Sequence, residues 1–162
     1  MPNFLTEEEL AEIRATMDEA IEKMVRRKIA AGGDGDFVDR DGYYDKVFLQ
    51  RLNLWKINDT IRRNFLSPEL VRLLCELAGV DGIRIWHDQA LQKQPWANPT
   101  AWHIDNPYWS FHSTNAISIW IALDDATVEN GCMYYLPGSH RIAGYEAVPI
   151  GENIASLFDV YP

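Results

Sequence analysis

The sequence predicts an α+β fold in which N-terminal helices pack on a cupin-like double-stranded β-helix, a jelly-roll barrel of short strands. Residues 1–80 carry apolar side chains at helical spacing, whereas residues 81–162 carry short, nearly alternating apolar runs separated by turns. Helices followed by strands are typical of α+β proteins, and 162 residues suit a single domain. About four or five strands are expected where a jelly roll needs about eight, so the predicted barrel is incomplete.

The helical part is expected to contain three helices. The first runs from about Glu7 to about Ala30, and Thr6 and Glu9 have the spacing of a capping box at its start. A second helical pattern covers about Asp45 to Arg63. The third helix opens on a Ser-Pro pair and ends at a glycine, within residues 67–79.

The β part is expected to contain four main strands. Their segments are residues 83–91, 101–105, 116–123 and 132–136. The third is apolar almost throughout, so we expect it to be buried on both faces. The tail, Glu152 to Tyr161, is expected to be a helix or an extended connector.

Composition and charge narrow the classes of partner. The net charge is −9 at pH 7, and an acidic surface repels phosphate backbones, so no nucleic-acid partner is expected. No apolar run approaches the roughly 18 residues of a membrane helix, and the N-terminus lacks the pattern of a secretory signal. Cys75 and Cys132 lie far apart and are expected to be thiols in a reduced compartment. We therefore expect a cytoplasmic protein with no membrane partner.

The segment Trp102-His103-Ile104-Asp105-Asn106 is the main candidate for chemistry. In a strand, residues two positions apart point to the same face, so His103 and Asp105 would present an imidazole nitrogen and a carboxylate side by side. These groups are two of the three ligands in the 2-His-1-carboxylate triad of non-haem iron enzymes. The spacing alone is weak, because an HxD triplet also arises by chance on strand ends.

Three motifs in this order resemble the phytanoyl-CoA dioxygenase family. They are the HxD triplet at residues 103–105, W-I-A-L-D-D-A-T-V-E-N-G at 120–131, and L-P-G-S-H-R at 136–141. The ordered resemblance covers about Ile83 to Arg141. It implies an Fe(II)- and 2-oxoglutarate-dependent dioxygenase that hydroxylates a small organic or lipid-like substrate.

The resemblance also implies roles for particular residues. His103 and Asp105 match the first two iron ligands, and no catalytic residue is expected beyond the metal ligands. Lys93 and Trp120 match positions near the co-substrate 2-oxoglutarate. The pair at residues 130–131 matches a turn whose glycine supplies positive φ. His140 matches a structural turn position rather than a ligand.

Substrate contacts are expected from side chains in and beside the loop at residues 106–115. The candidates are Trp102, Asn106, Trp109 and His112. Core packing for the two tryptophans and a solvated loop position for the histidine are the alternatives. The chemistry of this loop does not name a substrate.

The resemblance implies two further groups that the sequence does not show. A family member carries a third ligand, a histidine on a late strand, and then an arginine for the far carboxylate of 2-oxoglutarate. No histidine follows His140 and no arginine follows Arg141. We therefore expect a truncated or partial chain with weak iron affinity and little turnover. Ile104 stands where relatives often have glutamine, so one polar contact beside the metal is expected to be absent.

Three other classes of function stay open on the sequence. A cupin-like metalloenzyme of another reaction would use His87 with His103 and Asp105, and would not need 2-oxoglutarate. A non-catalytic binding or scaffold domain would bind no metal, and the exposed apolar edge of its barrel would favour a homodimer. A structural β-sandwich would carry its histidines by chance.

Overall fold

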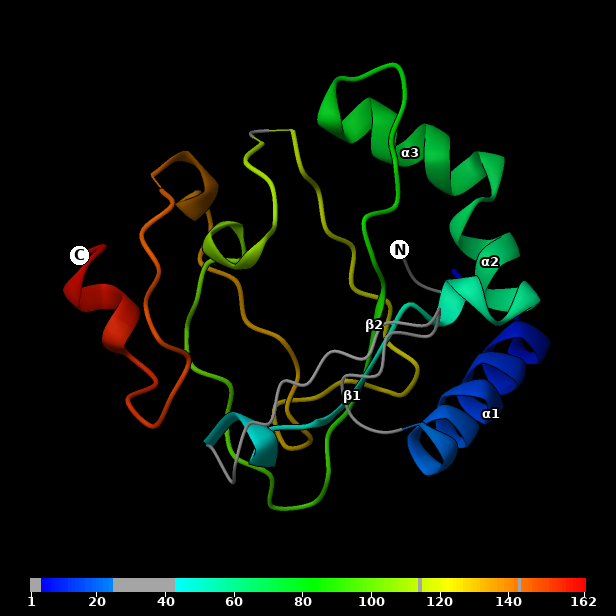
Figure 1. Ribbon diagram of the computed structural model, residues 1–162, viewed down its shortest axis with the longest axis horizontal. Coiled ribbons are helices and arrows are strands. Elements are labelled where there is room, and N and C mark those ends of the chain that lie inside the picture. The colour runs from blue at the N-terminus through cyan, green and yellow to red at the C-terminus, as the bar shows by residue number, and fades with distance from the viewer. Residues whose placement is uncertain (1–3, 25–42, 114, 143) are drawn as a thin grey trace. The chain divides into compact units, whose positions relative to one another are not determined.

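The computed structural model describes residues 4–24, 43–113, 115–142 and 144–162 (Figure 1). The helices are α1 (Glu7–Lys23), α2 (Asp59–Phe65) and α3 (Pro68–Ala78), and the strands are β1 (Leu49–Leu52) and β2 (Gln89–Gln92). Short 3₁₀ helices cover Tyr43–Lys46, Leu54–Lys56, Asn106–Tyr108, Ser139–Arg141 and Ser156–Asp159. None of the described helices is long and apolar enough to cross a bilayer.

The chain divides into two compact units. The first unit takes its described residues from Met1–Val38, Leu49–Gln92 and Ile117–Leu123, and it contains the three α-helices and the sheet. The second unit takes its described residues from Asp39–Phe48, Lys93–Ala116 and Asp124–Pro162. The HxD segment lies in the second unit. The single-domain organisation with a helical part and a β part stays a prediction.

Helix α1 begins as predicted and ends earlier than predicted. Glu9 N–H donates to Thr6 Oγ1 at 3.2 Å, and Thr6 N–H donates to the Glu9 carboxylate at 2.9 Å, so the capping box is confirmed. Met24 leaves the helix with φ −99° and ψ 133°. The predicted end at Ala30 is therefore wrong, and residues 25–42 lie outside the described part of the chain.

The end of α1 is bound by a side chain from β1. The buried Arg51 guanidinium donates to the carbonyl oxygens of Ala20 at 2.9 Å and Ile21 at 2.5 Å. The Ala20 carbonyl also accepts the Met24 N–H at 2.9 Å, so the guanidinium adds a second donor there and supplies a donor to the last-turn carbonyl of Ile21. The apolar side of α1 packs into the core of the first unit, whose buried members are Ile13, Ala20, Leu54 and Ile61.

The predicted helix from Asp45 to Arg63 is wrong over most of its length. Residues Leu49–Leu52 form β1 instead, which pairs antiparallel with β2 in the register Leu49↔Gln92 to Leu52↔Gln89. After the strand, Asn53 adopts a left-handed conformation (φ 61°) and the 3₁₀ helix Leu54–Lys56 follows. Apolar residues at short intervals fit both helix and strand, and the strand partner lies about forty residues away in sequence.

The turn after β1 is bound by Asp88. Its two carboxylate oxygens accept the N–H groups of Leu54 and Trp55, each at 3.1 Å, and its carbonyl accepts Asn53 N–H at 3.0 Å. Burial raises the pKa of Asp88, and the two N–H groups oppose that effect. This residue therefore fixes the change from strand to 3₁₀ helix.

Helix α3 agrees with its prediction. Ser67 Oγ accepts Leu70 N–H at 3.3 Å, Pro68 lies in the first turn, and Gly79 ends the helix with φ 66°. In the tail, residues Ser156–Asp159 form a short 3₁₀ helix within the expected helix or connector.

The predicted strands of a barrel are not paired. Within the described ranges, the ladder between β1 and β2 is the sheet, and the predicted strand at 83–91 is regular only from Gln89. Segments 101–105, 116–123 and 132–136 run without ladder partners there. Ile117 and Ile119 are 40% and 44% exposed, so the prediction of burial on both faces is wrong. A strand forms when a neighbouring strand satisfies its backbone N–H and C=O groups in a ladder, and these segments have no ladder neighbour among the described residues.

Candidate metal-binding site

The site is built on the segment after Asn98 in the second unit. Ala101 is buried, and the next residue is tied to the tail, because Trp102 N–H donates to the Ile154 carbonyl at 2.9 Å. The Trp102 ring also packs at tilted angles on Phe158 and Tyr134, with centroids 5.6 and 6.5 Å away. These contacts hold the backbone that precedes His103.

His103 has a defined tautomer. Its Nδ1 lies 2.9 Å from the Ala101 carbonyl oxygen, and because a carbonyl only accepts, Nδ1 carries the hydrogen. The lone pair of the neutral ring is therefore on Nε2. That atom lies 3.4 Å from Asp105 Oδ1. A backbone carbonyl that orients a histidine in this way is common behind metal ligands.

A turn, and not the expected strand, brings the two side chains together. Asp105 has helical backbone angles (φ −73°, ψ −36°) and precedes the 3₁₀ helix Asn106–Tyr108. Tyr108 N–H donates to the Asp105 carbonyl at 2.9 Å. This turn places the carboxylate beside the imidazole.

The carboxylate of Asp105 affects the charge state of His103. The Asp105 carboxylate raises the pKa of His103 by hydrogen bonding, while burial of the ring opposes the shift. One third of the His103 side chain and about half of the Asp105 side chain are exposed (33% and 54%). The carboxylate thus stabilises the protonated imidazole relative to a free histidine, and the pair stays accessible to solvent.

The pair offers a metal ion two donors of suitable chemistry, one nitrogen and one carboxylate oxygen. No group of three or more His, Cys, Asp or Glu side chains suited to a metal occurs among the described residues. The residues present therefore fit two positions around an iron ion. His112 does not complete the set, and its ring contacts Tyr145 edge-on at 4.9 Å.

Lys93 has a defined environment in the same unit. Its Nζ donates to the Asn98 carbonyl at 2.8 Å and to the Val47 carbonyl at 3.2 Å. Burial lowers the pKa of Lys93. Two of the three N–H groups of the ammonium thus donate to backbone carbonyls, and the third has no partner among the described residues.

The remaining predicted residues are distributed over both units. Trp120, assigned to the co-substrate, belongs to the first unit and its side chain is 46% exposed. Asn106 opens the 3₁₀ helix that follows Asp105, and the Trp109 ring stacks on Phe111 with centroids 5.3 Å apart. His87 lies in the first unit and packs on Trp86, with centroids 3.9 Å apart. The roles predicted for these residues and for His112 stay predictions.

Sequence reasoning missed two tyrosines near the pair. Slight burial and, as a smaller effect, the negative charge of Asp105 raise the pKa of Tyr135. The Tyr108 hydroxyl donates to the Val148 carbonyl and so ties the turn after Asp105 to a buried position. The sequence predicts a strand over 132–136, but no local pattern singles out either tyrosine.

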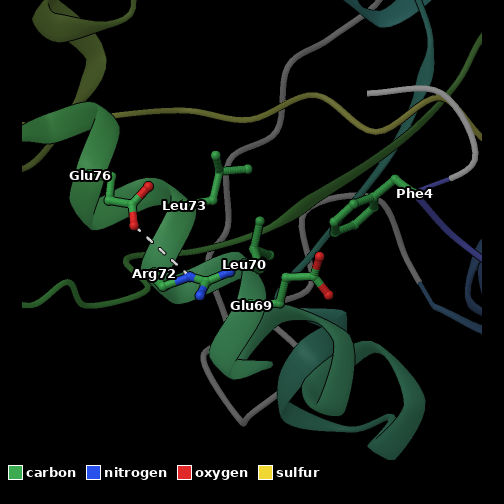
Figure 2. A pocket seen from close by; sticks show the side chains of 6 residues that line it. All are labelled: Phe4, Glu69, Leu70, Arg72, Leu73 and Glu76. Atoms are coloured by element: carbon green, nitrogen blue, oxygen red, sulfur yellow. Dashed lines mark ion pairs between the residues drawn. The ribbon is translucent and has the colours of Figure 1, made fainter.

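A shallow pocket in the first unit contains none of the predicted site residues. Figure 2 shows its lining, with Arg72 and Glu76 forming an exposed ion pair at 3.9 Å. Its lining residues are Phe4, Glu69, Leu70, Arg72, Leu73 and Glu76. The pocket is formed mainly by one side of α3 and brings together no metal-binding set.

Known proteins resemble the chain over most of its length. A family model described as phytanoyl-CoA dioxygenase (PhyH) matches residues 1–153. Dioxygenase lolE1 of Epichloe uncinata is 41% identical over 92 residues, which are 56% of this chain and 34% of that protein. A probable alpha-ketoglutarate-dependent hypophosphite dioxygenase of Stutzerimonas stutzeri is 26% identical over 147 residues, which are 89% of this chain and 50% of that protein.

A third relative covers less of the chain. Phytanoyl-CoA dioxygenase 1 of Oryza sativa subsp. japonica is 37% identical over 57 residues, or 35% of this chain and 20% of that protein. The matched part of this chain therefore spans half or less of each of these three relatives. No solved structure matches the chain.

Proposed function

Since the chain belongs to the phytanoyl-CoA dioxygenase family, we propose that His103 and Asp105 are two iron ligands of an Fe(II)- and 2-oxoglutarate-dependent dioxygenase. The observation that carries this proposal is the 3.4 Å approach of His103 Nε2 to Asp105 Oδ1, with Nδ1 bound to the Ala101 carbonyl. It leaves a nitrogen lone pair beside a carboxylate, as two adjacent positions of a facial triad require.

The residues of the chain orient the ligands. The Ala101 carbonyl fixes the imidazole tautomer, and the turn after Asp105 sets the direction of the carboxylate. The charge of Asp105 offsets part of the metal charge. When bound, Fe(II) together with 2-oxoglutarate and O₂ supplies the oxidising chemistry for hydroxylation of a C–H bond.

We assign the co-substrate contacts to Lys93 and Trp120. The remaining N–H of the Lys93 ammonium is available to a carboxylate of 2-oxoglutarate, a charge-assisted hydrogen bond. The name of the Stutzerimonas stutzeri relative includes dependence on alpha-ketoglutarate, which supports this co-substrate. The substrate is proposed to be a small organic or lipid-like molecule, contacted from Trp102, Asn106, Trp109 and His112.

A cupin-like double-stranded β-helix is the fold that the family implies. In the proposed barrel, the segments predicted as strands at 101–105, 116–123 and 132–136 gain ladder partners. The described residues supply two metal ligands, and the family resemblance implies that the third is a histidine. Two ligands hold iron weakly, since even loss of a group behind the ligands costs about 10–100-fold in affinity.

Anaerobic titration with Fe(II) in the presence of 2-oxoglutarate tests the proposal. The expected result is a weak visible charge-transfer band that requires both additions. His103→Ala is expected to abolish the band, whereas His140→Ala, a change at an exposed position of another turn, is expected to retain it. Identical titrations for the wild type and His103→Ala would show that the pair does not bind the metal. Succinate formation would separate this reaction from that of a metalloenzyme that does not use 2-oxoglutarate.

A further inference from the structure

The ammonium of Lys93 donates hydrogen bonds to two backbone carbonyls. Asn98 O is 2.8 Å from Nζ and Val47 O is 3.2 Å away, and Val47 is completely buried. Both acceptors are neutral dipoles, and no described carboxylate forms an ion pair with the ammonium. A carboxylate that reaches the remaining N–H would find a charged partner held in place.

The two carbonyls are themselves fixed. Asn98 N–H donates to the Lys46 carbonyl at 2.9 Å, and its side-chain amide donates to the Tyr43 carbonyl at 3.2 Å. The Tyr43 hydroxyl donates to the Pro99 carbonyl at 2.7 Å. Three hydrogen bonds thus join the segment before Phe48 to the segment around Asn98. They hold in place the two carbonyls that bind the ammonium.

The stem of Lys93 is confined by a turn from later in the chain. A Cβ at Gly131 would lie 2.7 Å from Lys93 Cδ, closer than real Cβ contacts, and 3.0 Å from Cε, tighter than most of them. Gly131 also has φ +88°, as the sequence predicted for this turn. Only glycine meets both conditions, so the backbone at this point approaches the lysine stem directly.

Asn130 closes that turn. Its Oδ1 accepts Thr127 N–H at 2.7 Å, and its Nδ2 donates to the Asp125 carbonyl at 2.5 Å. Cys132 N–H donates to the Thr127 carbonyl at 2.9 Å. These bonds set the path of the backbone through Gly131 and therefore its approach to Lys93.

We propose that the Asn130-Gly131 turn is a positioning element for Lys93, which directs the remaining N–H of its ammonium toward a carboxylate co-substrate. The close approach of Gly131 limits the direction of the lysine stem, and the carbonyls of Val47 and Asn98 fix the position of Nζ. The positioning itself stands on the contacts above, and only the identity of the carboxylate as 2-oxoglutarate rests on the proposed function.

The effect of an added methyl at Gly131 separates positioning from folding. The atoms it would meet belong to a flexible side chain, so the lysine stem moves more easily than the backbone. The movement breaks the contacts of Nζ with its two carbonyls. Gly138 provides a matched control, because it has φ +81° and nothing within 4 Å of an added Cβ.

Nuclear magnetic resonance of the lysine ammonium groups tests the positioning. An ammonium held by two carbonyls exchanges its protons slowly, so Lys93 is expected to give a resolved signal that Lys93→Arg removes. Gly131→Ala is expected to shift or abolish this signal, and Gly138→Ala is expected to leave it unmoved. Absence of the signal in the wild type, or its persistence unchanged in Gly131→Ala, would overturn the proposal.

A second variant covers the case in which Gly131→Ala does not fold. Asn130→Ala removes the two side-chain bonds that close the turn and adds no atom near Lys93. It is expected to shift the same ammonium signal while the far-ultraviolet circular dichroism of the protein is retained. An unmoved signal in a folded Asn130→Ala protein would overturn the positioning role.

Calorimetry with 2-oxoglutarate and Mn(II) tests the co-substrate separately. Gly131→Ala is expected to weaken 2-oxoglutarate binding about tenfold, as loss of one charge-assisted hydrogen bond would, and Gly138→Ala to change it less than about twofold. If wild-type protein binds no 2-oxoglutarate while the ammonium signal behaves as stated, the proposed function fails and the positioning stands. If 2-oxoglutarate binds equally to the wild type and Gly131→Ala, the turn does not position Lys93 for it.

Discussion

His103 donates its Nδ1 hydrogen to the carbonyl oxygen of Ala101 at 2.9 Å, and this bond leaves Nε2 facing Asp105. The histidine is therefore oriented before any metal is present. Its charge state follows from the same geometry, because the neighbouring carboxylate raises the pKa of His103. The first prediction concerns that charge.

In the metal-free protein, His103 is expected to titrate above the usual range of a histidine, and Asp105→Asn is expected to lower its pKa. Nuclear magnetic resonance of the imidazole C–H groups measures both values. Glu152→Gln, which removes an exposed charge elsewhere in the second unit, is the control. A His103 pKa that does not respond to Asp105→Asn would contradict the pairing.

The direction of the His103 pKa shift also determines how its contribution to stability changes with pH. Because the folded-state pKa of His103 is raised, the stability it contributes is present at pH below the usual histidine pKa and is lost as pH rises through the raised value. The pair is partly exposed, so the effect is expected to be below about 1 kcal/mol. Urea unfolding of the wild type and His103→Gln on both sides of that window measures it, and a difference that grows with rising pH would contradict it.

A second prediction concerns Asp88 in the first unit. Asp88→Ala removes the acceptor for the N–H groups of Leu54 and Trp55, and the expected loss of unfolding free energy is about 1–3 kcal/mol. Asp81→Ala, at an exposed position that also precedes β2, is expected to change the unfolding free energy by less than about 0.5 kcal/mol. Chemical denaturation measures both, and equal effects of the two changes would contradict the capping role.

The pH dependence of the Asp88 contribution has a definite sign. Burial raises the pKa of Asp88, so the folded state binds its proton more tightly than the unfolded state. Ionisation therefore lowers the stability contribution of this group as pH rises from the usual aspartate pKa through the raised value. Denaturation of the wild type and Asp88→Asn over the acid range is expected to show that extra slope in the wild type alone.

Local rules predicted part of this structure well. The start of α1, both ends of α3 and the positive φ of Gly131 each depend on residues within a few positions, and all agree with the sequence. The approach of His103 to Asp105 is also local. Strand alternation predicts that the two side chains lie together, whereas a turn at Asp105 brings them together, and their role as metal ligands stays a prediction.

Contacts between distant residues account for what the sequence could not predict. Strand β1 forms because β2, about forty residues later, pairs with it, whereas its apolar spacing fits a helix equally well. The end of α1 is bound by Arg51, and the position of the Lys93 ammonium depends on the Val47 carbonyl. The segments predicted as strands at 116–123 and 132–136 show the converse, since strand propensity alone forms no strand without a ladder partner.

A third prediction concerns Arg51. Arg51→Met removes the charged donor that binds the Ala20 and Ile21 carbonyls and leaves those oxygens without it at the end of α1. The expected loss of unfolding free energy is about 2 kcal/mol or more, since hydrogen bonds from charged groups contribute about 1.5–3 kcal/mol each. Arg72→Met, at an exposed ion pair on α3, is the control and is expected to stay within about 0.5 kcal/mol. Equal effects in thermal or urea unfolding would show that Arg51 does not stabilise the helix end.

The fourth prediction separates the two reasons for glycine at position 131. Gly131→Ala introduces backbone strain at φ +88° and a clash with the Lys93 stem, whereas Gly138→Ala introduces only strain, at φ +81°. The control is therefore expected to lose about 1 kcal/mol of unfolding free energy and Gly131→Ala more than that. In a Lys93→Ala background the stem is absent, so Gly131→Ala is expected to cost only as much as the control. Urea unfolding of the four proteins in this double-mutant cycle gives the coupling energy, and additive effects of the two changes would show that Gly131 and Lys93 do not act on each other.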